Sequence, residues 1–270
     1  MSRNTLVLGG TRYFGKHLVQ LLLDRGDNVY IASRGNYPIP KKCNFIKFDR
    51  DYGLYKGPVT FDIVYDQSCY LGAQICSIKN IILNAGLYIL TSSQSVYPFK
   101  ENLKEYEAKI CEGVTGYGLE KLKAEECALK LTNRATVVRF PVVIGANDYY
   151  KRVHKIKNDI FNGEIVIPSN NPLLNIIYEV DAAKALFKLS EVKSMGAINI
   201  ASPYQVSPKE ICYHIASKFN RSFELKLDED FNPSFYSIFK RHPKTLNLDK
   251  QKGLGFDFFT DPMDTMDQSV

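Results

Sequence analysis

The stretch LVLGGTRYFGKHL, residues 6–18, decides the fold. An apolar run is followed at once by Gly9, Gly10 and Gly15, and the pattern then becomes helical. Glycines at these places let a backbone turn tightly and approach a pyrophosphate, whose charge is met by free N–H groups at the start of the helix. The stretch therefore predicts a strand, a dinucleotide-binding turn and a helix. Arg12 occupies the middle of the turn, where a further glycine is usual.

Outward from this stretch, short apolar strands alternate with helical patterns. Alternation of this kind predicts an α/β fold, a doubly wound parallel sheet (Rossmann) with helices on both faces. After residue 145 the rhythm changes, and a smaller C-terminal substrate lobe is expected. We assign residues 1–148 and 175–202 to the Rossmann domain, and residues 149–174 and 203–270 to the lobe. Strands are expected at 5–10, 28–33, 43–48, 61–66, 87–92, 135–145 and 197–202, helices at 16–26, 72–84, 114–132, 149–162, 179–192 and from 207, and a loose tail at 261–270.

The composition sets limits on the class of protein. The net charge of +6 is mild, and no basic block with interleaved aromatics favours nucleic-acid binding. No secretory leader pattern and no run of about 18 apolar residues is present, so a cytoplasmic protein without a membrane span is expected. Histidines at ligand spacing and a GxSxG elbow are both absent, which argues against a metal site and a serine hydrolase. The scattered cysteines predict mainly buried free thiols in a reducing compartment (Cys43, Cys69, Cys76, Cys111, Cys127 and Cys212).

The end of the second predicted strand bears on the choice of cofactor. A carboxylate there would bind the ribose 2′-hydroxyl of NAD, whereas a basic residue accommodates the 2′-phosphate of NADP. The chain has Ser33 and Arg34 at this place. Together with Arg12, the guanidinium group of Arg34 would suit one phosphate, because planar guanidinium groups match phosphate geometry. NADP is therefore the expected cofactor, with NAD as the alternative; each arginine taken alone would equally suit an exposed surface charge.

Tyr117 and Lys121 lie four residues apart in a helical pattern, so both project from one helix face. A free phenol has a pKa of about 10, too high for easy proton exchange at neutral pH. A neighbouring ammonium group in a partly dry cleft would lower that pKa. YxxxK alone is more often part of a surface helix, so the pair needs a third group.

The segment TSSQSVYP, residues 91–98, supplies that group at the end of a predicted parallel strand. Strand ends on this edge bind ligands in open α/β sheets. Ser93 would hydrogen-bond the substrate oxygen that Tyr117 protonates, and Thr91 and Ser92 would help to line the cofactor site. In isolation these serines would suit a polar strand end or a helix cap.

Taken together, these motifs resemble the extended short-chain dehydrogenase/reductases of the NAD(P)-dependent epimerase/dehydratase family. GGTRYFG (9–15) resembles the family's glycine turn in its variant with arginine, and YGLEK (117–121) matches its Tyr/Lys pair. FDRD (48–51), SSQSVYP (92–98), RFPVVIG (139–145) and IIYEVDAAKAL (176–186) resemble further elements of the family.

The resemblance implies roles for particular residues. It makes Ser93, Tyr117 and Lys121 catalytic, with Lys121 also on the nicotinamide ribose. Arg241 is a candidate substrate clamp, although a surface role suits it better. A homodimer is expected through the helices near 72–84 and 114–132. Cofactor contacts are expected from Gly9, Gly10, Thr11, Arg12, Phe14, Gly15, Ser33, Arg34, Asp49 at the adenine, Thr91, Tyr117, Lys121 and Pro141.

We therefore expect an NADP(H)-dependent oxidoreductase, a ketoreductase acting on a nucleotide-linked sugar. The alternative is a nucleotide-sugar epimerase, which uses the same hydride and proton machinery. Sugar dehydration is not expected, because Gln94 and Ser95 replace the Asp-Glu pair of the family's dehydratase branch. A second alternative, a non-enzymatic NADP-sensing or RNA-binding protein, follows from relatives that share the arginine-type turn, but the retained Ser, Tyr and Lys residues favour the enzyme.

Overall fold

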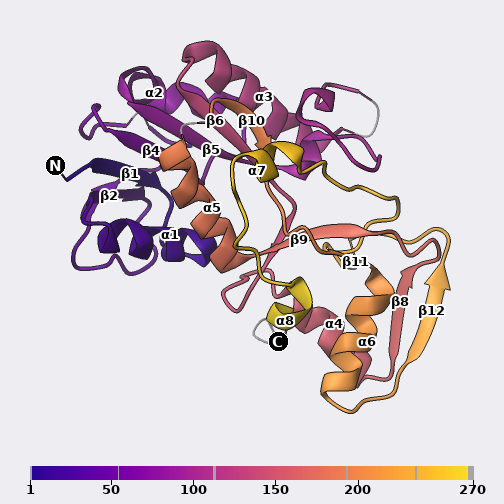
Figure 1. The fold of residues 1–270 in the computed structure, drawn as a ribbon. Helices are drawn as coiled ribbons and strands as arrows, with labels where there is room; N and C mark the ends of the chain where they lie inside the picture. Colours follow the sequence, from indigo (N-terminus) through magenta and orange to yellow (C-terminus); the bar gives the residue numbers. More distant parts are fainter. Residues whose placement is uncertain (1, 54, 112–113, 193, 235, 267–270) are drawn as a thin grey trace.

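A seven-stranded, fully parallel sheet forms the frame of the protein, in the order β3-β2-β1-β4-β5-β6-β10 (Figure 1). The computed structural model describes residues 2–53, 55–111, 114–192, 194–234 and 236–266. The strand order reverses between β1 and β4, and ligands of such sheets bind at the carboxyl ends beside this reversal. The strands are β1 (Asn4–Leu8), β2 (Asn28–Ser33), β3 (Asn44–Lys47), β4 (Ile63–Asp66), β5 (Leu87–Ser93), β6 (Ala135–Phe140) and β10 (Gly196–Asn199).

Helices cover both faces of this sheet, as the alternating pattern predicts. On one face α1 (Tyr13–Asp24) and α5 (Glu179–Val192) pack side by side over apolar residues of the strands. On the other face lie the 3₁₀ helix η1 (Gly72–Ile78), α2 (Lys79–Asn84) and α3 (Gly116–Leu131). The sheet is buried on both sides, and the polar side chains at its carboxyl edge are therefore the ones left to meet a ligand.

Pro141 divides the strand that the sequence predicts at 135–145. Proline has no N–H group to donate to a sheet, so β6 ends at Phe140 and the chain changes sheet. The following strand, β7 (Val142–Ile144), pairs with β9 (Leu174–Tyr178), which pairs in turn with β11 (Gln205–Val206). β9 is thus not a strand of the main sheet, although we grouped its residues with the Rossmann domain.

The C-terminal part of the chain builds a second layer of structure beside this three-stranded sheet (Figure 1). α4 (Arg152–Phe161) and α6 (Pro208–Lys218) pack on the parallel pair β8 (Glu164–Pro168) and β12 (Glu224–Asp228) around a separate apolar core. α6 begins at the expected capping box, in which Ser207 and Glu210 exchange hydrogen bonds. α7 (Asp249–Gly253) lies against β10.

Three local expectations differ from the structure. The segment 72–84 is a 3₁₀ helix followed by a short α-helix. The predicted loose tail contains α8 (Pro262–Met266), which is held because Met266 is buried in the core of the C-terminal part; residues 267–270 lie outside the described residues. All six cysteines are free, but Cys76 and Cys127 are exposed on helical surfaces, and the buried ones are Cys69 and Cys212.

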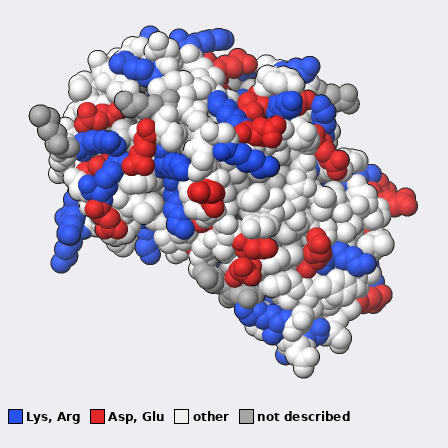
Figure 2. Space-filling model, in the orientation of Figure 1, with Lys and Arg blue, Asp and Glu red and all other residues white. Residues whose placement is uncertain are grey.

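The surface carries both signs of charge. On the face shown in Figure 2, basic and acidic side chains are intermixed over the sheet domain and the C-terminal part. Across the described stretches of chain, no helix has the length and hydropathy that crossing a membrane requires.

Candidate active site

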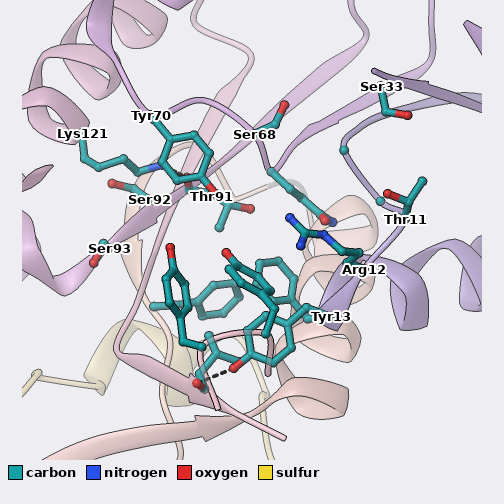
Figure 3. Close-up of a pocket in the computed structure, with 18 of the residues that line it drawn as sticks. Thr11, Arg12, Tyr13, Ser33, Ser68, Tyr70, Thr91, Ser92, Ser93 and Lys121 are labelled. Atoms are coloured by element: carbon teal, nitrogen blue, oxygen red, sulfur yellow. Dashed lines mark hydrogen bonds between the residues drawn. The ribbon is translucent and has the colours of Figure 1, made fainter. Parts of the chain in front are cut away.

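A cavity of about 800 Å³ opens along the carboxyl edge of the main sheet, beside the strand-order reversal. Figure 3 shows Thr11, Arg12 and Ser33 at one end of it and Ser93 and Lys121 at the other. Segments far apart in sequence therefore converge on one site. Of the residues singled out from the sequence, the lining includes Gly9, Gly10, Thr11, Arg12, Phe14, Ser33, Arg34, Asp49, Thr91, Ser92, Ser93, Tyr117, Lys121 and Pro141.

The glycine turn has the backbone geometry that its sequence predicts. Gly9 and Gly10 adopt φ angles of +97° and +78°, which side chains with a Cβ rarely tolerate. Gly15 does not line the cavity, because it packs behind the turn: a Cβ there would lie 2.8 Å from the Cα of Gly10 and 2.3 Å from Oε1 of Gln67. Gly15 thus allows the helix start to approach the turn closely. α1 begins at Tyr13, three residues earlier than expected, so its unpaired N–H groups face the turn.

The residues present fit a bound dinucleotide. Oγ1 of Thr91 and Nε2 of Gln67 are buried without a hydrogen-bond partner among the described residues, and both side chains line the cavity. Buried polar atoms are normally satisfied, so atoms of this kind in a cavity indicate a polar ligand. The glycine cradle and the start of α1 suit its phosphates.

Arg12 is held by two aromatic rings across the mouth of the cavity. Its guanidinium carbon lies 4.4 Å from the ring centroids of both Tyr37 and Tyr149, and its Nη1 donates to the Tyr37 hydroxyl at 2.9 Å. Tyr37 follows β2, the strand that ends at Ser33. Arg12 therefore lies beside the strand end that selects the cofactor, and Arg34 is exposed at the same rim.

Asp49 of the acidic element FDRD is part of the cavity lining, as expected for a residue that would contact the adenine. The next residue, Arg50, was not expected in the site. Its guanidinium forms two hydrogen bonds of 2.9 Å with buried Asp66 at the end of β4. Although burial opposes ionisation, the Arg50 charge holds the pKa of Asp66 below its ordinary value. Arg50 thus lies in the cavity wall with its charge neutralised by Asp66.

Ser93 and Tyr117 meet at the other end of the cavity. The Ser93 hydroxyl donates to the Ser95 hydroxyl and accepts from the backbone N–H of Ser95, both at 3.1 Å. Tyr117 keeps 49% of its surface exposed, yet desolvation of its phenol in the cavity, together with the nearby Tyr70 ring, raises its pKa above the ordinary value; Ser93 and the Arg152 charge act in the opposite direction. Two hydroxyl groups that can exchange a proton with a ligand or bind its oxygen therefore lie at this end of the cavity.

Lys121 lies one helical turn from Tyr117 and is buried, with 4% of its surface exposed. Its Nζ donates to the backbone carbonyls of Cys69 at 2.7 Å and of Thr91 at 2.5 Å. Burial lowers the pKa of Lys121. The expectation that Lys121 lowers the pKa of Tyr117 is not what the structure shows, because the ammonium is bound to two carbonyls and the groups that lower that pKa are Ser93 and Arg152.

A buried network links β5, β6 and α3. Glu125, one turn beyond Lys121 on α3, forms an ion pair of 2.6 Å with Arg139 of β6 and accepts a hydrogen bond from Ser92. Arg139 also donates to the Tyr97 hydroxyl at 2.8 Å. Ser92 is thereby turned toward the interior, although it also borders the cavity.

Sequence reasoning missed the residues that close the far side of the cavity. Asp148 accepts backbone N–H bonds from Tyr150 and Arg152, which directs Tyr149 and Tyr150 to the cavity before α4 begins. The position of these tyrosines directly after the RFPVVIG segment was the available signal. Other lining residues that were missed include Tyr13, whose phenol donates to the Val143 carbonyl (Figure 3), Tyr37, Arg50, Tyr70, Ser237 and Lys240.

Arg241, the candidate clamp, does not line the cavity. Its guanidinium pairs with the exposed carboxylate of Asp230 at 2.7 Å on the surface of the C-terminal part. Its neighbour Lys240 lines the cavity instead.

No family model matches the chain. A segment is 30% identical over 114 residues to the chloroplast stem-loop binding protein of 41 kDa b of Arabidopsis thaliana, a match that covers 35% of this chain and 30% of that protein. This chain therefore matches about a third of the length of that curated relative.

Solved structures agree with the chain over nearly its whole length. UDP-glucuronic acid 4-epimerase from Bacillus cereus, in complex with NAD, has a TM-score of 0.77 at 16% identity and covers 98% of this chain and 96% of its own. MoeE5, in complex with UDP-glucuronic acid and NAD, has a TM-score of 0.76 at 20% identity, with coverage of 98% and 97%. The chain thus has the Rossmann-like fold of NAD-dependent epimerase and dehydratase enzymes.

Proposed function

We propose that the chain is a nicotinamide-dinucleotide-dependent oxidoreductase that epimerises a nucleotide-linked sugar through a transient keto sugar. The observation that carries this proposal is the convergence of Ser93, Tyr117 and buried Lys121 at one end of a cavity that begins at the glycine turn. Neither end of the cavity alone would support it, because glycine turns and YxxxK spacings are common.

The chain's own residues perform the proton chemistry. When bound, the cofactor supplies a nicotinamide ring that accepts a hydride from the sugar carbon and returns it. In its deprotonated form Tyr117 would accept the hydroxyl proton of that carbon and then return it, while Ser93 holds the oxygen by a hydrogen bond. Lys121 fixes the segment after β4 and the end of β5 through its bonds to the Cys69 and Thr91 carbonyls. Its ammonium group would also hold the ribose of a bound cofactor.

Epimerisation is favoured over the net reduction that the sequence led us to expect. The reductase preference rested on the strand end at Ser33 and Arg34, which bears on the cofactor and not on the direction of reaction. Ser93, Tyr117 and Lys121 suit both reactions. The solved structures with this fold include nucleotide-sugar epimerases, and this likeness supports the epimerase alternative.

For the cofactor we propose NADP over NAD. The solved structures that we compare contain NAD. The β2 end of this chain, however, has no carboxylate, and Arg12, Arg34 and the Tyr37 hydroxyl gather at its rim. Two guanidinium groups at that place suit a 2′-phosphate.

The test is to incubate the purified protein with a panel of UDP-sugars and with either NAD or NADP. The sugars are followed by NMR and the reduced cofactor by absorbance. The proposal expects a new sugar epimer without net change of cofactor, and loss of turnover by at least about 100-fold in Tyr117→Phe with cofactor binding retained. Stoichiometric oxidation of NADPH with a keto sugar would instead establish the reductase, and turnover unchanged in Tyr117→Phe would contradict both.

RNA binding is the second candidate, and the sequence match to the chloroplast stem-loop binding protein favours it. Its test is a gel-shift titration with a stem-loop RNA at two salt concentrations, since phosphate contacts give a strong salt dependence. Binding that is unaffected by Tyr117→Phe, together with no sugar turnover, would favour this function over the enzyme.

A further inference from the structure

A second, smaller pocket adjoins the main cavity at the catalytic tyrosine. Its volume is about 230 Å³, and it shares Gln94, Ser95, Tyr117 and Lys240 with the main cavity. Its remaining walls come from both parts of the chain: Phe99, Thr115, Gly118, Pro233 and Lys244. A group placed in it would therefore lie next to the phenol and away from the glycine turn.

Two lysines of this pocket form no ion pair with any carboxylate of the described residues. Lys244 is buried, with 6% of its surface exposed; its Nζ donates to the Tyr97 backbone carbonyl at 2.5 Å and lies 4.5 Å from the Phe99 ring centroid. Nζ of Lys240 donates to the Ser237 carbonyl at 2.9 Å. Within the described ranges of the chain, neither ammonium forms an ion pair.

The surroundings of the two lysines disfavour their charge. Burial, with the nearby Arg152 guanidinium, lowers the pKa of Lys240 to about 8. Burial, with the Lys240 charge, lowers the pKa of Lys244 to about 8. Because Arg152 disfavours the charge of Lys240 and Lys240 disfavours the charge of Lys244, an anion between the two lysines would stabilise both charged forms. Buried charges are normally paired, so this arrangement indicates a negatively charged ligand group.

The position of the pocket restricts which anion suits it. Gln94 and Ser95, which border both cavities, are uncharged and would not repel a carboxylate beside Tyr117. The opening at Tyr117 places the group on or next to the carbon that reacts, so a substituent of the reacting sugar ring reaches it. Arg152, on the wall of the main cavity, is already paired with Asp148 at 2.8 Å.

We propose that the pocket formed by Phe99, Thr115, Lys240 and Lys244 binds a carboxylate of the same sugar ring that reacts at Tyr117. The substrate is then a nucleotide-linked uronic acid. This inference rests on the proposed function and names the substrate class of that site.

The experiment compares two ligands that differ in this group, UDP-glucuronic acid and UDP-glucose, by isothermal titration calorimetry at pH 7 with cofactor present. The wild type is expected to bind the uronic acid roughly 10- to 100-fold more tightly, the effect of a charge-assisted hydrogen bond. Lys244→Met and Lys240→Met should each remove most of this preference and leave UDP-glucose affinity within about twofold. Exposed Lys252, on α7, supplies the matched control, and Lys252→Met should bind both ligands as the wild type does.

Turnover of the two ligands is measured in parallel, so that the two proposals fail in different ways. Equal wild-type affinity for both ligands, or an unchanged preference in both variants, overturns the carboxylate pocket while epimerisation can still be observed. An equal loss of affinity for both ligands in the variants also overturns it, because the lysines would then bind the diphosphate that the two ligands share. Binding of neither ligand, with no turnover of any UDP-sugar, overturns the proposed function together with this inference.

Discussion

The interior behind β5 and β6 and the end of the cavity at Tyr117 differ in how buried charged side chains are neutralised. In the interior, Arg139 meets the buried carboxylate of Glu125 at 2.6 Å. On the cavity side, three lysines meet backbone carbonyls or an aromatic ring instead (Lys121, Lys240 and Lys244).

The difference separates groups that hold the fold from groups placed for a ligand. A buried ion pair is complete within the chain, and breaking it leaves an uncompensated charge. A desolvated ammonium without a carboxylate has a lowered pKa and gains most from charge or dipoles that a ligand brings. Substitutions in the first region should therefore change stability, and those in the second should change binding and turnover.

The largest effect on stability is expected from Arg139→Met. Buried Glu125 would lose its partner, and the free energy of unfolding should fall by about 3–5 kcal/mol. Urea unfolding followed by circular dichroism measures this. The double variant Glu125→Leu/Arg139→Met should recover much of the loss, because no charge is then left unpaired. If the free energy of unfolding of Arg139→Met falls by less than about 1 kcal/mol, the Arg139–Glu125 ion pair does not distinguish the interior from the cavity.

Lys121→Met should act on turnover. We expect kcat to fall by about 100-fold, because the group next to Tyr117 and the cofactor ribose is removed. The same urea experiment should show a folded protein with a cooperative transition. Lys123→Met on the same helix, whose ammonium pairs with Glu120 on the surface, is the control and should keep normal turnover. Equal turnover in the two variants would remove Lys121 from the proposed mechanism.

Arg12→Gln tests a charged group at the opposite end of the cavity, where the cofactor's adenosine is expected to bind. If Arg12 contacts the 2′-phosphate, affinity for NADP should fall by about 10- to 30-fold and affinity for NAD should change little. Fluorescence titration of both reduced cofactors measures this. A parallel loss of NAD and NADP binding would assign Arg12 to the pyrophosphate or to the Tyr37 and Tyr149 rings instead.

The pocket lysines should make ligand binding dependent on pH. The pKa of about 8 in the folded chain lies below the ordinary value for lysine, so the folded state loses these protons first as the pH rises. Stability should therefore increase from pH 8 to 10, whereas affinity for UDP-glucuronic acid should fall by about tenfold between pH 7 and pH 9. The charged groups around them are Arg152 beside Lys240, and Lys240 with the Cys111 thiol beside Lys244. A pH-independent affinity would show that the lysines do not contact the carboxylate.

The smallest effect is expected at Arg241. Its exposed pair with Asp230 is of the kind that contributes less than about 1 kcal/mol. Arg241→Gln should leave nucleotide-sugar affinity within about twofold of wild type by calorimetry. A tenfold loss would restore the expectation that this arginine clamps the substrate.

Local patterns predicted the frame of the molecule well. The glycine turn, the alternation of strands and helices and the capping box at Ser207 depend on neighbouring residues, and each is present in the structure. Ser93 and Tyr117 also line one cavity, as expected: Ser93 ends β5 at the carboxyl edge of the sheet, and Tyr117 lies at the start of α3 beside it. The packing of Gly15 behind the turn could not be predicted from the sequence, because it depends on which backbones come close. The pairing of β7 with β9 after Pro141 depends on contacts between distant segments in the same way.

What the sequence determined by itself is thus the Rossmann frame and the residue types brought to its edge, since spacing along the chain sets the turn and the face of a helix. Tertiary structure alone decided which charges are neutralised. Glu125 meets Arg139 and Asp66 meets Arg50, whereas Lys240 and Lys244 of the C-terminal part line one pocket with Tyr117 and pair with no carboxylate in the part of the chain that the structure describes. The physical reason is that Coulomb energy and desolvation depend on distances across the folded chain, and these distances leave no local pattern in the sequence.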